Sequence, residues 1–436
     1  MMKKNRTIYF LLALVCLGLQ SCLFQEEDYF DDSSANRATA DVKRCSELLE
    51  AAPNGWVMEY YVGKDYSLGG ITLLCKFDSQ RVTMASQIAG ADETVSSLYS
   101  VKSEQATMLS FDTYNYLVHY FGQPQGSMAD DPNGTLGGDY EFVISDATAD
   151  RIELKGKKYG NRIVMKAFSA DQTWKQYLTR IKKVEDDAFF YEYDLRMDGL
   201  YTGQMLRSNY TFIVTYYDEV GKVHQKTVPF MFTTDGMRFH EPVTIDGQTM
   251  QNFVWKNEEI SFVCTDEGAT EVKMKGIYID GYQSYDYYPG TYLMDFYRLN
   301  GATNQLEVAS QEIQLVKNED GKSYWLKGLE YDILVTYDKP RGGLSILPQF
   351  LKKVQGGYVY LAMWDLMNDY VLRSSAIGLI SYPTTDGIYL VDNGVWMGEI
   401  SGFIFGVYNS QDEEASFMGY TDAVAAIRLV KKTIEE

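Results

Sequence analysis

Residues 140–168 read YEFVISDATADRIELKGKKYGNRIVMKAF. Three segments of this stretch, 140–145, 151–155 and 162–168, are rich in Val, Ile and Phe, and short polar links join them. This pattern is typical of β-strands. Links this short leave no room for a crossover helix, so consecutive strands pair antiparallel. The stretch therefore predicts a three-stranded antiparallel meander.

The strand pattern continues on both sides of this meander. Segments 56–62 and 71–77 precede it, and the chain from residue 210 onward is almost all strand between Gly, Asp and Asn turns. We predict a mainly β protein, α+β at the N-terminus, with antiparallel meander, sandwich or barrel-like sheets and a few short helices. Sandwich and barrel both remain open at this point.

Apolar residues at helical spacing indicate a first helix within 42–52 and a later one that follows a Ser169–Gln172 capping box. The acidic run 185–187 after this later helix is typical of a linker. We therefore predict an N-terminal α+β domain over 41–187 and a β-rich region over 195–436, with a break near 280–292 if that region divides again.

The N-terminus has the parts of a secretion signal. Cations at positions 3, 4 and 6 precede an apolar run at 8–19, which is shorter than the roughly 20 residues of a membrane-spanning helix. Ser21 then precedes Cys22, as in the lipobox of bacterial lipoproteins. We predict that residues 1–21 are a lipoprotein signal peptide and that Cys22 carries acyl chains. An ordinary secretory signal with an incidental cysteine is the alternative.

An acidic segment follows Cys22. Residues 25–32 hold five carboxylates, and small polar residues continue to position 40, so we predict a flexible tether over 22–40. The acidic part also resembles the export signal of surface-displayed lipoproteins of Bacteroidetes. The expected location is the outer membrane, lipid-anchored and on the cell surface; the alternative is a plain spacer on the periplasmic face.

The charge excludes some partners. The 436 residues have a formal net charge of -20, which becomes about -23 when the three signal cations are removed. A surface this acidic repels nucleic-acid phosphates and anionic lipid. We therefore expect no nucleic-acid partner, and attachment to the membrane only through the lipid.

Residue types for common catalytic and metal sites are scarce. His119, His224 and His240 are the only histidines, and none has metal-ligand spacing to another. The loop 130–134 is typical of a turn and lacks the first and last carboxylates of a calcium loop. No nucleophile elbow or phosphate-binding loop is present. We predict no cofactor, no metal site and no catalytic residues.

Three cysteines remain after the signal and Cys22 are set aside: Cys45, Cys75 and Cys264. They are widely spaced and form no CxxC pair. An odd number of cysteines this far apart favours buried thiols that pack as small apolar groups, rather than a disulfide framework.

The densest chemical feature is segment 278–292, which holds six tyrosines among Gly, Asp and Pro. Tyrosine offers a flat apolar face and a hydroxyl group, which suits a sugar ring or a protein partner. Tyr282, Tyr285, Tyr287 and Tyr288 are therefore candidate ligand contacts. The alternative is that these rings stack across neighbouring strands or cover a sheet edge.

Several motifs carry a resemblance to a known family. They are Pro53-Asn54-Gly55-Trp56, 109–115, 138–142, 154–158 and, in the second half, Asp392-Asn393-Gly394-Val395-Trp396. In these the chain resembles an uncharacterised family of Bacteroidetes lipoproteins, the domain of unknown function 4302. The resemblance implies no activity and no assigned residues. It implies a context: accessory members of uptake systems that pair a TonB-dependent transporter with a lipoprotein lid.

These observations favour a non-enzymatic accessory lipoprotein of the outer membrane. We expect it to capture a nutrient ligand, such as a glycan or a peptide, or to hand one over to a TonB-dependent uptake system. A surface hydrolase of glycans or peptides is one alternative, which requires a cleft with two facing carboxylates. An adhesin or structural cell-surface subunit is the other.

Overall fold

The structure, a computed structural model, describes residues 33–124, 135–218, 220–412 and 414–432. The prediction of a mainly β, antiparallel protein with a few short helices is confirmed, because every strand pairing in these ranges is antiparallel. The open choice between sandwich and barrel is resolved for two of the three sheets, which close as barrels.

The first barrel is an eight-stranded meander in which β1 pairs with β8 to close the ring. Its core is lined by alternate residues of every strand, with Trp56 and Tyr60 fully buried. The predicted meander of residues 140–168 forms its last three strands. The strands are β1 (Trp56–Val62), β2 (Gly69–Asp78), β3 (Arg81–Ser86), β4 (Val95–Ser103), β5 (Thr107–Phe111), β6 (Glu141–Ala147), β7 (Arg151–Gly156) and β8 (Arg162–Ala167).

Helix α2 (Ser34–Ala51) precedes this barrel, and Cys45 and Leu49 extend from it into the barrel core. The helix begins earlier than the apolar pattern indicated, because the Ser33 hydroxyl accepts a hydrogen bond from the Asn36 amide and caps it. Residues 34–40, which the sequence assigned to the tether, therefore belong to the helix. A short helix, α3 (Tyr116–His119), lies between β5 and β6.

The second barrel is built in the same way. It follows helix α4 (Trp174–Asp187), which is capped by a Thr173–Gln176 box rather than by the predicted Ser169–Gln172 box. Eight strands then form a meander that closes through β16 and β9. They are β9 (Glu192–Met197), β10 (Leu200–Ser208), β11 (Thr211–Tyr217), β12 (Val223–Phe232), β13 (Gly236–Ile245), β14 (Gln248–Lys256), β15 (Ser261–Cys264) and β16 (Lys273–Ile277).

The two barrels repeat one arrangement of helix, short link and first strand. Residues 52–55 join α2 to β1, and residues 188–191 join α4 to β9. In the first unit the Trp56 indole donates to the Leu49 carbonyl (2.9 Å), and in the second the Tyr193 hydroxyl donates to the Ala188 carbonyl (2.8 Å). Each aromatic residue thus satisfies a carbonyl at the C-terminal end of its helix, which the helix itself leaves unpaired.

The third sheet has twelve strands, and the pairing of β17 with β28 returns eight of them to their starting point: β17-β18-β19-β20-β21-β25-β26-β28. β27, β23 and β22 extend from β28, and β24 pairs with β23. The bounds are β17 (Gly290–Asn300), β18 (Gln305–Lys317), β19 (Ser323–Lys327), β20 (Ile333–Asp338), β21 (Gly343–Ile346), β22 (Gln349–Val354), β23 (Gly357–Asp365), β24 (Tyr370–Leu372), β25 (Leu379–Thr384), β26 (Gly387–Asp392), β27 (Gly402–Tyr408) and β28 (Phe417–Lys431).

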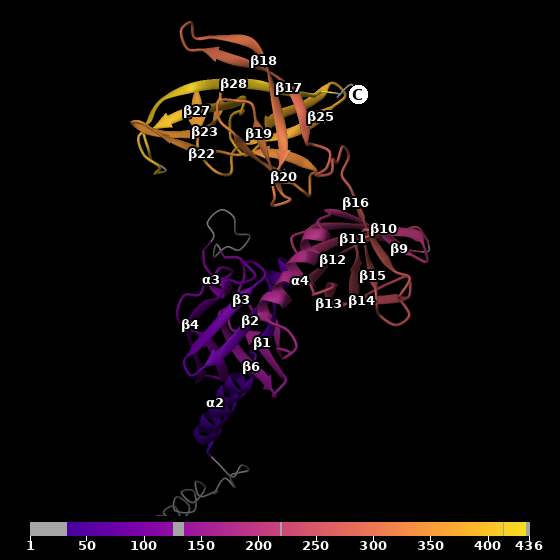
Figure 1. The fold of residues 1–436 in the computed structure, drawn as a ribbon. Coiled ribbons are helices and arrows are strands. Elements are labelled where there is room, and N and C mark those ends of the chain that lie inside the picture. Colours follow the sequence, from indigo (N-terminus) through magenta and orange to yellow (C-terminus); the bar gives the residue numbers. More distant parts are fainter. Residues whose placement is uncertain (1–32, 125–134, 219, 413, 433–436) are drawn as a thin grey trace, which may run out of the picture.

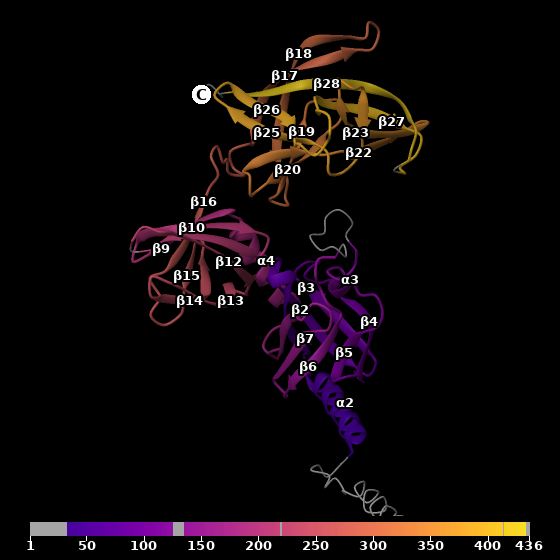
Figure 2. The same ribbon diagram turned by 180° about the vertical axis from the view of Figure 1, so that it is seen from behind.

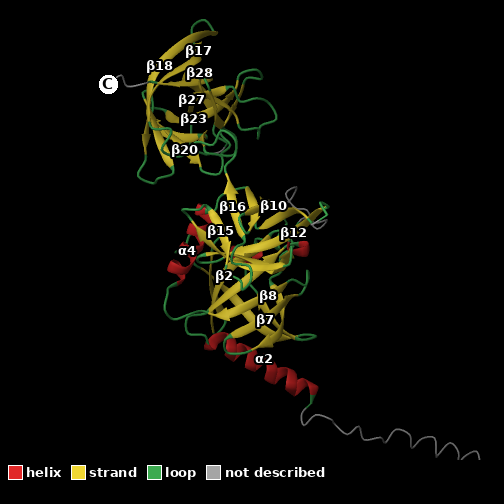
Figure 3. Ribbon diagram, turned by 90° about the vertical axis from the view of Figure 1, so that its right-hand side faces the viewer, coloured by secondary structure: helices red, strands yellow, loops and turns green. Residues whose placement is uncertain are grey.

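The three β units follow one another along the molecule. Helix α2 lies at one end and the twelve-stranded sheet at the other (Figures 1 and 2). Helix α4 lies between the barrels, as the view by secondary structure shows (Figure 3). Residues 278–289 join β16 to β17, within the region where the sequence placed a possible break.

The barrels contact each other closely along β2 and β12. At Gly69 the backbone φ is +71°, and a Cβ atom there would lie 2.0 Å from the Tyr210 carbonyl oxygen. Only glycine permits both this backbone conformation and this approach. The contact places outer faces of the two barrels opposite each other.

Candidate functional site

The predicted tyrosines of segment 278–292 lie between the second barrel and the third sheet. Tyr288 is fully buried, and its hydroxyl donates to the Gly342 carbonyl (2.8 Å). Tyr285 stacks on Tyr324 with ring centres 4.7 Å apart, and its hydroxyl donates to the Ser323 carbonyl (2.8 Å). The stacking alternative therefore describes both of these rings.

Tyr282 and Tyr287 are more accessible. Tyr282 is half-buried, lies parallel to Phe189 at 6.0 Å and accepts a hydrogen bond from Tyr337. Tyr287 is 39% exposed, with the Lys431 ammonium 5.2 Å from its ring centre. The four tyrosines do not share one exposed face, because Tyr288 packs inside the core of the third sheet. Ligand binding at Tyr282 and Tyr287 stays a prediction.

The other singled-out residues are dispersed. The His119 Nδ1 atom lies 3.0 Å from the Asn115 carbonyl oxygen. The His224 Nε2 atom lies 2.8 Å from the Asp218 carboxylate. No group of His, Cys, Asp and Glu in the described ranges could hold a metal ion. Cys22 and the loop 130–134 lie outside the described residues.

The three cysteines are buried free thiols, as predicted. Burial raises the pKa of the Cys75 thiol, and it raises that of Cys264 to about 11. Thiols with raised pKa values are poor nucleophiles at neutral pH. These cysteines therefore act as packing groups.

A polar hollow of about 930 Å³ lies between the outer faces of the two barrels, and we call it the inter-barrel groove. One wall comes from β1, β6, β7 and β8 of the first barrel with the turn that follows β1, and the other comes from β13 and β14 of the second. Its charged and aromatic lining residues are Glu59, Tyr61, Tyr66, Arg151, Glu153, Lys155, Arg162, Arg238, His240 and Glu241.

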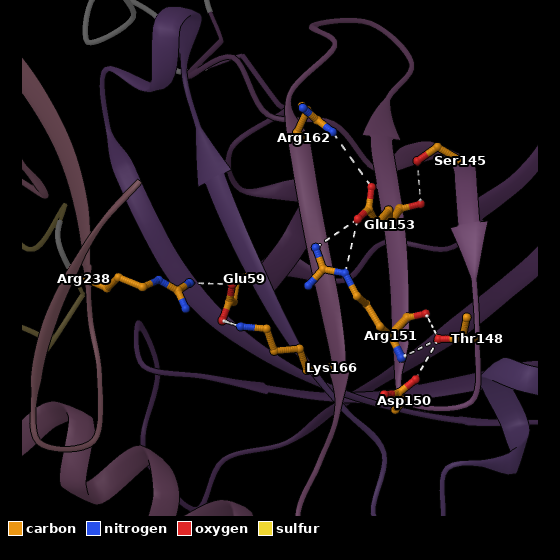
Figure 4. A network of polar contacts seen from close by, with 9 residues as sticks. All are labelled: Glu59, Ser145, Thr148, Asp150, Arg151, Glu153, Arg162, Lys166 and Arg238. Atoms are coloured by element: carbon orange, nitrogen blue, oxygen red, sulfur yellow. Dashed lines mark hydrogen bonds and ion pairs between the residues drawn. The ribbon is translucent and has the colours of Figure 1, made fainter. Parts of the chain in front are cut away.

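Glu59 joins the two walls. Its carboxylate accepts from Arg238 of the second barrel (2.5 Å) and from Lys166 of the first (2.8 Å), as Figure 4 shows. Burial acts to raise the pKa of Glu59, but the adjacent guanidinium and ammonium groups outweigh it and hold the pKa below its ordinary value of 4.5. The carboxylate is therefore a fixed anion that ties the barrels together.

A second set of contacts lies farther along the first wall. Arg151 donates to Glu153 (2.9 Å), and Arg162 lies 3.9 Å from the same carboxylate (Figure 4). The Arg162 side chain is 78% exposed. The Arg151 guanidinium is thus fixed by its hydrogen bond to Glu153. The Arg162 guanidinium keeps N–H groups that can donate to another partner.

Aromatic rings line the groove beside these charges. The rings of Tyr61 and Tyr66 each lie 4.2 Å from that of His240, measured between ring centres. Tyr66 ends the turn η2 (Lys64–Tyr66), in which Asp65 and Tyr66 both have positive φ. Such a conformation is unfavourable for residues other than glycine and recurs at functional sites. Burial lowers the pKa of His240, so its imidazole is neutral at pH 7.

The role of Glu59 predicts a pH dependence. A carboxyl group whose pKa is lowered in the folded protein contributes stability above its unfolded pKa, and this contribution is lost as the pH falls through the folded value. We expect Glu59→Gln to be less stable than the unmodified protein at pH 7. The gap should close as the pH falls below about 4.5. Thermal unfolding of both proteins from pH 7 to pH 3 measures this; a gap that is independent of pH would contradict it.

Sequence reasoning missed this groove. Its residues come from six strands of two barrels, and each charged residue looks like an ordinary outward polar position of an alternating strand. One signal was present: Arg151, Glu153 and Lys155 alternate with the core residues of β7 and so share one face. Nothing in the sequence showed that a second barrel would cover that face.

The fold and the groove define an antiparallel protein of tandem eight-stranded barrels with a charged groove between them. A family model described as a domain of unknown function (DUF4302) matches residues 26–257, more than half of the chain. The chain belongs to this family, which confirms the domain of unknown function predicted from the sequence for the first half of the chain. A second model, also a domain of unknown function (DUF4987), matches residues 265–404.

The comparisons name no activity, and no curated protein matches the chain. Within the described ranges, no helix combines the length and apolar character needed to span a membrane.

Proposed function

We propose that this protein is a Bacteroidetes lipoprotein, anchored through Cys22 to the outer membrane, that captures a nutrient ligand in the inter-barrel groove. It then hands the ligand to a TonB-dependent transporter and its lipoprotein lid. The observation that carries this proposal is the groove itself: about 930 Å³ of polar space between two closed barrels. Sites between rigid units are frequent places for ligand binding.

The arrangement of charges favours binding over hydrolysis. A glycosidase needs one carboxyl group that stays protonated, with a raised pKa, opposite a second carboxylate. In the groove, Glu59 contacts Arg238 and Lys166, and Glu153 contacts Arg151. The pKa of Glu59 is lowered, which is the opposite of what a general acid requires. Glu59 therefore cannot supply the general acid that the surface-hydrolase alternative requires.

The anchor and the fold support surface display together. The predicted signal and acidic segment precede α2, which lies at the end of the molecule away from the twelve-stranded sheet (Figure 1). Attachment at Cys22 would leave both barrels and the third sheet outside the lipid. The groove would then be open to ligands from the medium.

The proposal is tested with the tagged, natively lipidated protein, extracted from its own outer membrane in mild detergent. We expect a TonB-dependent transporter and a lipoprotein lid to co-purify with it. In the Cys22→Ser variant the protein should leave the membrane fraction, and the transporter should no longer co-purify, because two acyl chains provide the stable anchor. Purification of the lipidated protein without these partners would contradict the uptake role.

A further inference from the structure

We propose that the inter-barrel groove binds an acidic saccharide, that is, a sugar ring bearing a carboxylate or sulfate group. This inference rests on the proposed capture function and specifies its ligand. The argument comes from charge, strand register, one unpaired hydroxyl group and the aromatic lining.

The groove is locally cationic in an acidic protein. Its lining holds the cations Arg151, Lys155, Arg162 and Arg238 against the carboxylates Glu59, Glu153 and Glu241, whereas the whole chain has a net charge of -20. An anion is therefore repelled by most of the surface and attracted here. The four cations exceed the three carboxylates by one, and a local excess of one sign of charge favours ligands of the other.

Two of these cations have capacity for a ligand. Among the described residues, the Lys155 ammonium has no hydrogen-bond or ion-pair partner. Arg162 has only the 3.9 Å contact with Glu153. Lys155 pairs with Arg162 across β7 and β8, so both side chains leave the sheet at the same level. Guanidinium and ammonium groups side by side are suited to a carboxylate or sulfate.

The same row continues to Tyr61. Ile163 pairs with Tyr60 across β8 and β1, which places Tyr61 next to Arg162 in the antiparallel register. The row Lys155–Arg162–Tyr61 therefore spans three adjacent strands, about 10 Å at the usual strand spacing. It places two cations and one tyrosine at neighbouring positions of three adjacent strands.

The Tyr61 hydroxyl is the strongest sign of a missing partner. Tyr61 is 4% exposed, and its hydroxyl oxygen is buried without a hydrogen bond of normal geometry among the described residues. Its charged neighbour is the Arg238 guanidinium, which Glu59 already holds. Its ring fills the space over Gly70, where a Cβ atom would lie 2.7 Å from it. Buried hydroxyl groups are nearly always paired. A sugar hydroxyl in the groove would supply the partner.

The opposite wall and the aromatic rings favour a sugar over an extended peptide. Gln251 and Asn252 add amide groups on β14, and the half-buried Tyr66 ring lines both this groove and a smaller hollow of about 190 Å³. A tyrosine ring provides an apolar face with a polar edge, which matches the alternating apolar and hydroxyl surfaces of a sugar.

The test uses the full mature protein and four soluble polymers: polygalacturonate, which carries carboxylates; dextran sulfate, which carries sulfates; neutral dextran; and polyglutamate. Affinity electrophoresis gives the dissociation constants. We expect at least one acidic polysaccharide to bind and neutral dextran not to bind. Which of the two binds distinguishes a carboxylate from a sulfate ligand.

Groove variants locate the binding. The double substitution Lys155→Gln and Arg162→Gln should weaken binding at least about tenfold, since each removes a charge-assisted hydrogen bond. Tyr61→Phe should weaken it about fivefold while leaving the thermal unfolding temperature unchanged or higher, because it removes an unpaired buried hydroxyl. Lys43→Gln, an exposed cation on α2 outside the groove, is the matched control and should bind like the unmodified protein.

The outcomes separate this inference from the function on which it rests. Absence of binding to both acidic polysaccharides would overturn it, as would groove variants that bind unchanged or polyglutamate that binds equally tightly. If the transporter still co-purifies in those cases, the capture function stands with another ligand. If it does not, both proposals fail.

Discussion

Replacing Arg238 by methionine is expected to lower the free energy of unfolding by about 3 kcal/mol. The guanidinium lies 2.5 Å from the Glu59 carboxylate, whose side chain is only 14% exposed. Methionine has a similar length but no charge, so the variant leaves a nearly buried anion with one partner instead of two. Removing the guanidinium destabilises the protein by more than the ion pair itself contributes, because the Glu59 carboxylate stays buried without that partner. Urea unfolding at pH 7 measures this change.

Lys166→Met is the matched control, because Lys166 contacts the same carboxylate from the first barrel at 2.8 Å but is 43% exposed. We expect a loss below about 1 kcal/mol, as for exposed ion pairs. Adding Glu59→Gln to Arg238→Met should restore part of the lost stability, since the unpaired anion is removed. Equal losses in the two single variants would contradict a special role for the contact between the barrels.

Tyr288→Ala is expected to destabilise the third sheet by about 3–5 kcal/mol. Tyr288 is fully buried in the core of that sheet, and its hydroxyl bonds the Gly342 carbonyl. Truncation leaves a cavity the size of an aromatic ring and an unpaired carbonyl. Urea unfolding measures the loss of stability. Limited proteolysis then shows whether the loss lies in the third sheet, residues 290–431.

Its neighbour in sequence, Tyr287, provides the comparison. Tyr287 is 39% exposed, so Tyr287→Ala should cost less than about 1 kcal/mol. Tyr288→Phe keeps the ring and removes only the hydroxyl, for an expected loss of about 1 kcal/mol. Similar stabilities of the two alanine variants would mean that Tyr288 does not support the core.

Local structure was predictable where neighbouring residues decide it. The meander of 140–168 appears as β6, β7 and β8, because alternation and short links leave one way to pair. The helices were found by their apolar faces, but their starts were displaced. The first helix begins at its Ser33 cap, before the predicted range, and the later one is capped by Thr173 rather than by the predicted Ser169. A cap needs only one side-chain hydroxyl that accepts from one backbone amide. Several residues near a helix start can supply that hydroxyl, so the sequence does not decide which one does.

The tyrosines that the sequence singled out differ in their surroundings, and a ligand-binding role for the accessible ones stays a prediction. Tyrosine density drew attention to segment 278–292, yet Tyr285 and Tyr288 serve the core and the stacking of the third sheet. The groove, by contrast, is built from residues that are unremarkable one by one. Lys155, Arg162 and Tyr61 come from three strands, and only the register brings them into one row.

The sequence by itself determined the antiparallel β class, the family and the expectation of a lipid anchor, because strand alternation, short links and local motifs are properties of adjacent residues. Tertiary structure alone decided three things: that β1 pairs with β8 and β9 with β16, that the barrels meet at Gly69, and that Glu59 lies opposite Arg238. Each of these joins residues tens to hundreds of positions apart. Such contacts depend on how whole sheets curve and close, and no local pattern encodes which distant face will cover them.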